Sequence, residues 1–139
     1  MDIRDIKKEF MTYRNGVIAD TLRQAGWPHK IIFGLNLPQL TEIARSLLVP
    51  DPELAQSLWA DREVRESRLL ASFLFDPQMA EDEVKKVCAD VRTREEADLL
   101  AFRWLRKHPC ARQLAEYFAT QDYELQRYLA NAIRRFLED

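Results

Sequence analysis

Apolar side chains recur at spacings of three and four residues along most of this chain, which is the period of an amphipathic helix. The first such stretch predicts a single long helix over residues 2–25, and Gly26-Trp27-Pro28 predicts its end. Gly16 lies inside this helix at a cost of about 1 kcal/mol, which indicates a kink or a close packing contact. The apolar stripe consists of Ile3, Ile6, Phe10, Tyr13, Val17, Thr21 and Leu22.

Start and stop signals divide the rest of the chain into shorter helices. Pro38 suits the first turn of a helix whose apolar face runs from Leu40 to Leu48. Asp51-Pro52-Glu53 places an acidic cap before a proline and predicts the next start. Thr93 and Glu96 have the spacing of a capping box and predict another. Further helices are expected near residues 63–75, 80–90, 110–119 and 122–137, with short connections that make successive helices antiparallel neighbours.

Three of these helices align on one another. Glu66–Ala71, Glu96–Ala101 and Leu125–Ala130 end alike, with an apolar residue, a leucine and an alanine, and the alanines are 30 and 29 residues apart. A two-helix unit that repeats at this length is the signature of an α-solenoid, in which stacked hairpins build a continuous core. The sequence therefore predicts an all-α fold, an α-solenoid or α–α superhelix, as a single domain over residues 1–139.

Equivalent positions of the repeats carry charges of alternating sign. Arg68, Asp98 and Arg127 each lie three residues before the alanine of their repeat. Because equivalent residues of a solenoid lie in a row, these side chains form either an ion ladder between repeats or a binding groove with a carboxylate at its centre. The sequence leaves both interpretations open.

The net charge of −2 hides a gradient along the chain. Residues 36–100 carry 8 Arg and Lys against 14 Asp and Glu, whereas residues 101–137 carry 7 against 3. A basic segment on an otherwise acidic protein provides a local anion site, or it is simply a solvated helix surface.

The larger aromatic side chains point to a core and not to a cofactor. Trp27, Trp59 and Trp104 lie among apolar residues at helical spacing, so we expect them in the core. His29 and His108 each flank a proline in a loop, and we expect both to be exposed.

The remaining chemistry is sparse. Cys88 and Cys110 have no partners at zinc-ligand spacing, so we expect two reduced, mostly buried thiols, no metal and no cofactor. No nucleophile–base arrangement or glycine-rich phosphate loop is present in the sequence. The charged start of the chain and the lack of a run of about 20 apolar residues predict a cytoplasmic protein without a membrane segment.

Three segments carry a resemblance to a known family. They are Phe33–Ala44, with Gly-x-x-x-Pro-x-Leu, Glu53–Trp59, with a Leu-Trp end, and Arg65–Ala71, with Glu-x-Arg-x-x-Ala. Together they resemble the AlkD-type DNA alkylation repair family, a group of HEAT-like repeat DNA glycosylases. The resemblance is clearest over residues 33–76, and it implies a stack of HEAT-like hairpins with a basic concave face that grips double-stranded DNA.

The resemblance also implies site residues. Asp98 aligns with the family's catalytic aspartate, which stabilises the cationic sugar as the base leaves, and Arg94 stands where the family has an aromatic residue that contacts the lesion. We therefore expect a DNA-binding protein with weak or no glycosylase activity. The alternative is a scaffold that binds a protein partner and no DNA. The DNA-binding candidates are Arg65, Arg68, Arg103, Arg106, Lys107 and Arg127.

Overall fold

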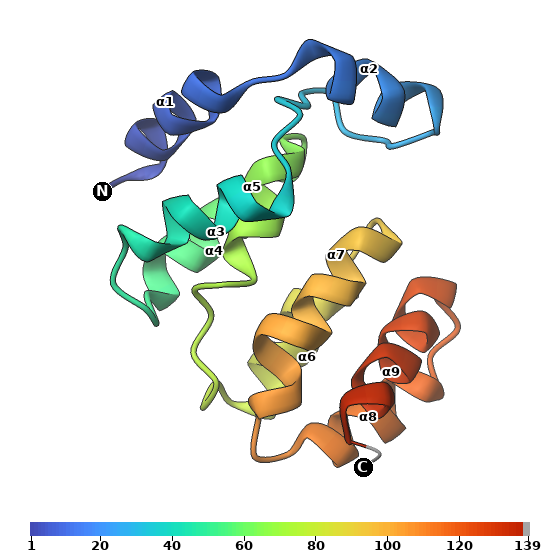
Figure 1. The fold of residues 1–139 in the computed structure, drawn as a ribbon. Coiled ribbons are helices and arrows are strands. Elements are labelled where there is room, and N and C mark those ends of the chain that lie inside the picture. Colours follow the sequence, from blue (N-terminus) through green and yellow to red (C-terminus); the bar gives the residue numbers. More distant parts are fainter. Residues whose placement is uncertain (138–139) are drawn as a thin grey trace. The chain divides into compact units, whose positions relative to one another are not determined.

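The computed structural model describes residues 1–137, which fold into two compact units that meet in sequence at Phe75 and Asp76. Over these residues the chain is all-α, as predicted, and its only β-type pairing is an isolated bridge between Ile31 and Val64. The first unit contains α1 (Ile3–Tyr13), α2 (Gly16–Gln24), α3 (Leu37–Arg45), α4 (Pro52–Ala60) and α5 (Arg65–Ala71) (Figure 1). The second contains α6 (Glu81–Ala89), α7 (Arg94–Leu99), α8 (Ala111–Ala119) and α9 (Glu124–Leu137). That both units act as one domain stays a prediction.

The first predicted helix is in fact two helices. The Asn15 side chain accepts hydrogen bonds from the backbone N–H groups of Val17 and Ile18 at 3.0 and 3.2 Å, and so starts α2. The backbone N–H of Asn15 donates to the carbonyl of Phe33 at 2.8 Å, which ties the break to the following loop. The prediction of one helix over residues 2–25 is wrong, because this local cap competes with the continuous apolar period.

The loop that meets Asn15 depends on a glycine. Gly34 has a φ of +87°, and a Cβ built on it would lie 2.2 Å from the carbonyl oxygen of Asn15. Only glycine fits both the left-handed backbone and this close approach. Of the two interpretations of Gly16, the close packing contact is not found, because a Cβ on Gly16 would meet nothing within 4 Å. The close contact lies at Gly34 instead.

Two predictions of exposure are corrected by the structure. His29 and His108 are buried, at 4% and 7% exposure, although both flank prolines. The His108 Nδ1 accepts from the N–H of Cys110 at 2.9 Å, so its Nε2 carries the proton and donates to the carbonyl of Met79 at 2.6 Å. Conversely, α3 ends at Arg45, and Leu48 is 86% exposed instead of lying on its apolar face.

Much of the predicted core is present, but Val17 of the first apolar stripe is 78% exposed and Thr21 is exposed as well. Trp59 and Trp104 are buried, and the Trp104 indole N–H donates to the carbonyl of Asp76 at 2.9 Å, whereas Trp27 is half-buried. Cys88 is a free, buried thiol whose pKa is raised by that burial, and Cys110 is half-buried. The three repeat alanines, Ala71, Ala101 and Ala130, are all fully buried, as close helix packing requires.

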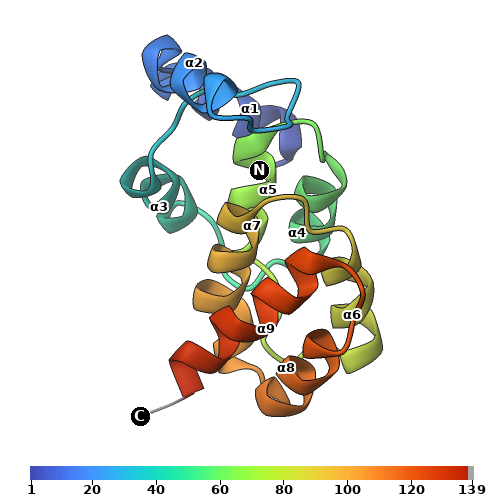
Figure 2. The ribbon, with the colours of Figure 1, turned by 90° about the vertical axis from the view of Figure 1, so that its right-hand side faces the viewer.

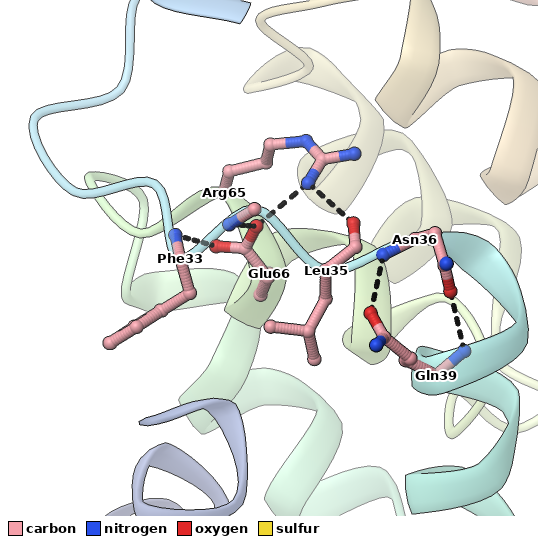
Figure 3. A network of polar contacts seen from close by, with 7 residues as sticks. Phe33, Leu35, Asn36, Gln39, Arg65 and Glu66 are labelled. Atoms are coloured by element: carbon pink, nitrogen blue, oxygen red, sulfur yellow. Dashed lines mark hydrogen bonds and ion pairs between the residues drawn. The ribbon is translucent and has the colours of Figure 1, made fainter. Parts of the chain in front are cut away.

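Two buried glutamates occupy equivalent positions of the repeats. The Glu66 carboxylate accepts from the N–H groups of Phe33 and Gly34 at 2.9 and 3.0 Å (Figure 3). Glu96 in the second unit is 1% exposed and accepts from the N–H of Arg92 at 2.9 Å. Each carboxylate satisfies loop backbone donors that would otherwise be buried without a partner. The second of them fixes the start of α7, which carries Asp98.

Candidate functional site

Two of the arginines proposed to bind DNA are buried in the first unit. The Arg65 Nη1 donates to the carbonyl of Leu35 at 2.9 Å and to the Glu66 carboxylate at 2.7 Å (Figure 3). Arg68 is 0% exposed; its Nη1 donates to the carbonyl of Trp59 at 2.8 Å, and its guanidinium lies 3.5 Å from the centroid of that ring. Burial of this kind leaves neither guanidinium a surface on which to meet a phosphate. Both arginines serve the interior of the unit instead.

Asp98 lies on α7 and faces α9. Its two carboxylate oxygens accept from the Tyr128 hydroxyl at 3.0 and 3.1 Å, and one of them lies 3.4 Å from Nη2 of Arg135. The side chain is 49% exposed, so the carboxylate is still open to a ligand. Tyr128 and Arg135 are the partners that sequence reasoning missed. The repeat pattern could have indicated Tyr128, because this residue follows Arg127, the repeat equivalent of Asp98.

Arg127 occupies the position of its repeat that is equivalent to Asp98, but its side chain points toward the loop between α8 and α9. Its Nη1 donates to the carbonyls of Gln121 and Asp122 at 2.8 and 2.5 Å, in the loop between α8 and α9. It therefore closes that loop and does not form the expected ladder step with Asp98. Its side chain remains exposed, so the DNA contact expected of Arg127 stays a prediction.

Arg94 extends the surface around Asp98 by one helical turn. Its guanidinium lies 5.2 Å from the centroid of the Tyr128 ring, and its Nη2 is 3.6 Å from a carboxylate oxygen of Glu124. Both groups of this ion pair are largely exposed, so the pair itself contributes at most about 1 kcal/mol. Arg94 thus lies over an aromatic ring, and its correspondence to the family's aromatic residue stays a prediction.

Beyond Asp98 the backbone changes from α-helix to a π-helical turn, Leu100–Trp104, and then to a 3₁₀ turn, Leu105–Lys107. Phe102 and Phe136 lie side by side here, with ring centroids 5.4 Å apart. The Arg106 guanidinium lies 4.5 Å from the centroid of Phe102 and 5.6 Å from that of Phe136. Two elements far apart in sequence therefore share one aromatic and cationic cluster.

Arg103 and Lys107 flank this cluster. The Arg103 guanidinium lies 5.1 Å from the centroid of Phe102, and burial, together with the nearby charge of Arg106, lowers its pKa. Lys107 is exposed at the end of the 3₁₀ turn. The DNA contacts expected of both stay predictions.

These contacts define a surface that we call the α7–α9 face. In both views α9 lies beside α7 and α8 (Figures 1 and 2). Arg94 and Asp98 lie four residues apart on α7 and therefore share one side of that helix, and Arg106 covers the ring of Phe102 in the π-helical and 3₁₀ turns that follow. The α7–α9 face consists of Arg94, Asp98, Phe102, Arg106, Tyr128, Arg135 and Phe136.

Other kinds of site are not found in the part of the chain that the structure describes. Over residues 1–137, no group of three or more His, Cys, Asp or Glu side chains converges in a way that could hold a metal ion. Within the same residues, no helix combines the length and the apolar character needed to span a membrane.

Comparison with known proteins shows the family of the chain. Residues 6–135 match the sequence profile described as DNA alkylation repair enzyme. The chain belongs to the DNA alkylation repair enzyme family. None of the curated proteins matches the sequence. The match includes every residue of the α7–α9 face except Phe136.

A solved structure supports the fold of this DNA alkylation repair family member. That structure is described as "a new family of proteins related to the HEAT-like repeat DNA glycosylases with affinity for branched DNA structures". The TM-score is 0.85 at 19% sequence identity, over 96% of this chain and 56% of the other. The predicted fold of HEAT-like helical hairpins is thus confirmed, and the chain spans little more than half the length of that relative.

Proposed function

We propose that this protein binds DNA through the α7–α9 face and has weak or no glycosylase activity. The observation that carries the proposal is that three exposed arginines lie on one surface with aromatic rings: Arg94 and Arg106 lie over Tyr128 and Phe102, and Arg135 pairs with Asp98. Arginine side chains bind phosphates in a planar, often bidentate way, and aromatic rings accept bases, so this combination suits a nucleic acid. Family membership and the DNA affinity described for the structural relative support the same ligand.

The weak or absent catalysis follows from the surroundings of Asp98. A carboxylate that assists glycosidic cleavage must face the sugar, where it stabilises the positive charge that develops. Here both carboxylate oxygens of Asp98 accept from the Tyr128 hydroxyl, and Arg135 lies beside one of them. Arg135 therefore offsets the negative charge with which Asp98 would stabilise a sugar cation. The family's aromatic contact to the lesion is also replaced by Arg94.

Binding is tested by titrating labelled duplex and four-way-junction DNA with the protein and following fluorescence anisotropy. If three phosphates are neutralised, log K should fall with log[salt] with a slope of about −3. Arg106→Gln and Arg135→Gln should each weaken binding and reduce that slope by about 1. Arg45→Gln is the matched control, because this exposed arginine of α3 pairs with Glu42 at 3.2 Å in the first unit. Equal losses in all three variants, or binding that is insensitive to salt, would contradict the proposal and favour the protein-scaffold alternative.

Catalysis is tested separately by measuring the release of methylated purines from alkylated DNA with the enzyme in excess over sites. We expect release close to the uncatalysed background for the wild type and for Asp98→Asn alike. Efficient release that is lost in Asp98→Asn would instead establish a glycosylase with Asp98 as its catalytic residue.

A further inference from the structure

One part of the α7–α9 face combines cations with an exposed aromatic ring. Phe136 is 37% exposed on α9 and lies beside a second aromatic ring. Its neighbour Phe102 lies on the π-helical turn, at a centroid distance of 5.4 Å and an interplanar angle of 49°. The two rings form a small apolar step within a cationic surface.

Arg106 is held over this step in a fixed orientation. Its Nε donates to the carbonyl of Phe102 at 2.6 Å, which anchors the guanidinium one helical turn after the ring that it covers. Arg103 approaches Phe102 as well, at 5.1 Å from the centroid, so that ring lies among two cations. Phe102 is therefore the support of the cluster, whereas Phe136 and the outer face of the Arg106 guanidinium are open to a ligand.

We propose that Phe102, Arg106 and Phe136 form a stacking site for an unpaired nucleobase, so that the protein holds single-stranded DNA better than its phosphate contacts alone allow. The inference rests on the proposed function. A base inside a duplex already has neighbours on both faces, but an unpaired base offers a free face to an aromatic ring or a guanidinium plane. Stacking of this kind depends little on sequence, and the nearby charge of Arg106 compensates the flanking phosphate.

The test compares binding of oligo-dT with binding of a blunt hairpin duplex of the same number of phosphates, by anisotropy at one salt concentration. Phe136→Leu keeps an apolar side chain but removes the flat ring, and should weaken oligo-dT binding by about fivefold or more and duplex binding by a clearly smaller factor, so that the preference for oligo-dT falls. Its salt slope should be unchanged, because no charge is lost. Arg106→Lys keeps the charge without the planar group, and should lower the preference in the same direction.

Tyr117→Leu is the matched control. Tyr117 is 36% exposed on α8 of the same unit and also lies next to a cation, with Lys85 Nζ 4.2 Å from its ring centroid. This variant should bind both DNAs like the wild type. The inference is overturned if Phe136→Leu weakens the two DNAs equally or leaves both unchanged, or if Tyr117→Leu has the same effect. If the wild type binds the duplex in those cases, the proposed function still holds without the stacking site. If the wild type binds neither DNA, both the proposed function and the stacking site are excluded.

Discussion

Single residues in this protein show how far a charge in the sequence can mislead. Arg65, Glu66 and Arg68 read as a polar surface, yet all three are at most 5% exposed. A buried charge is tolerated only when partners replace its water, and here backbone groups do so. The partners of Arg65 and Glu66 lie in the loop at Phe33–Leu35, about 30 residues away, and the partner of Arg68 is the carbonyl of Trp59 in α4, so no local pattern predicts them.

The Glu66 carboxylate should be the most sensitive polar group of the first unit. Glu66→Gln removes the charge that faces Arg65 and places an amide N–H₂ among donors, so we expect a loss of about 3 kcal/mol in the free energy of unfolding. Urea denaturation followed by circular dichroism measures it. Glu42→Gln, in an exposed pair with Arg45, should change stability by less than about 0.5 kcal/mol. Similar effects of the two changes would mean that burial of Glu66 does not matter.

Two glycines should respond in opposite ways to the same substitution. Gly34→Ala forces a Cβ against the carbonyl of Asn15 at a positive φ, and should destabilise the protein by about 1–3 kcal/mol. Gly16→Ala adds a methyl group to open space at the start of α2, and should stabilise by about 0.4–1 kcal/mol. Thermal midpoints of the two variants should therefore lie on either side of that of the wild type.

At the scale of helices, the sequence predicts those starts that carry their own chemistry. Asp51 before Pro52 and Thr93 before Glu96 cap α4 and α7, because the cap and its N–H partner lie within three residues. The sequence does not predict the break before α2, although Asn15 caps that helix locally, because Val17 and Ile18 continue the apolar period. Of the cluster around Asp98, the sequence indicates Asp98 itself, Arg94 and Arg106, whereas Phe102 is not a candidate there, and Tyr128, Arg135 and Phe136 come from the packing of α9.

Loss of the α7 cap should loosen the site locally. Thr93→Ala removes the acceptor for the Glu96 N–H, at 3.0 Å, and should cost about 1 kcal/mol. Hydrogen exchange should report faster exchange for the first amides of α7 and little change in α8. Thr120→Ala is the control, because its exposed hydroxyl donates to the carbonyl of Tyr117 and accepts from Nε2 of Gln121, both at the end of α8 and away from α7. Unchanged exchange in α7 would show that the side chain of Thr93 does not hold the helix start.

At the scale of the whole molecule, positive charge is distributed unequally. Residues 1–75 carry 10 Arg and Lys against 10 Asp and Glu, whereas residues 101–137 carry 7 against 3. Two of the arginines in the first unit are also buried and bonded within it. Residues 76–100 of the second unit carry 4 Arg and Lys against 8 Asp and Glu, so any attraction for a polyanion is concentrated in residues 101–137 and not in the second unit as a whole.

Bound DNA should accordingly protect one part of the chain. We expect hydrogen exchange in the presence of saturating duplex to slow in α7 and α9, and to stay unchanged in α1 and α2. Raising the salt concentration should abolish the protection, because phosphate contacts release counterions. Protection of α1 and α2 to the same degree would show that the first unit shares the binding surface.

The π-helical turn at Leu100–Trp104 has a consequence for how the second unit meets its ligand. Such a turn holds one residue more than an α-helical turn, and one residue corresponds to about 100° of rotation about the axis. The direction in which Arg106 and Lys107 point about the helix axis therefore depends on the π-helical turn that precedes them. In a relative with the same side chains but one residue fewer in this turn, the equivalent cations would point in a different direction. Such a relative would have to bind its ligand on another part of its surface.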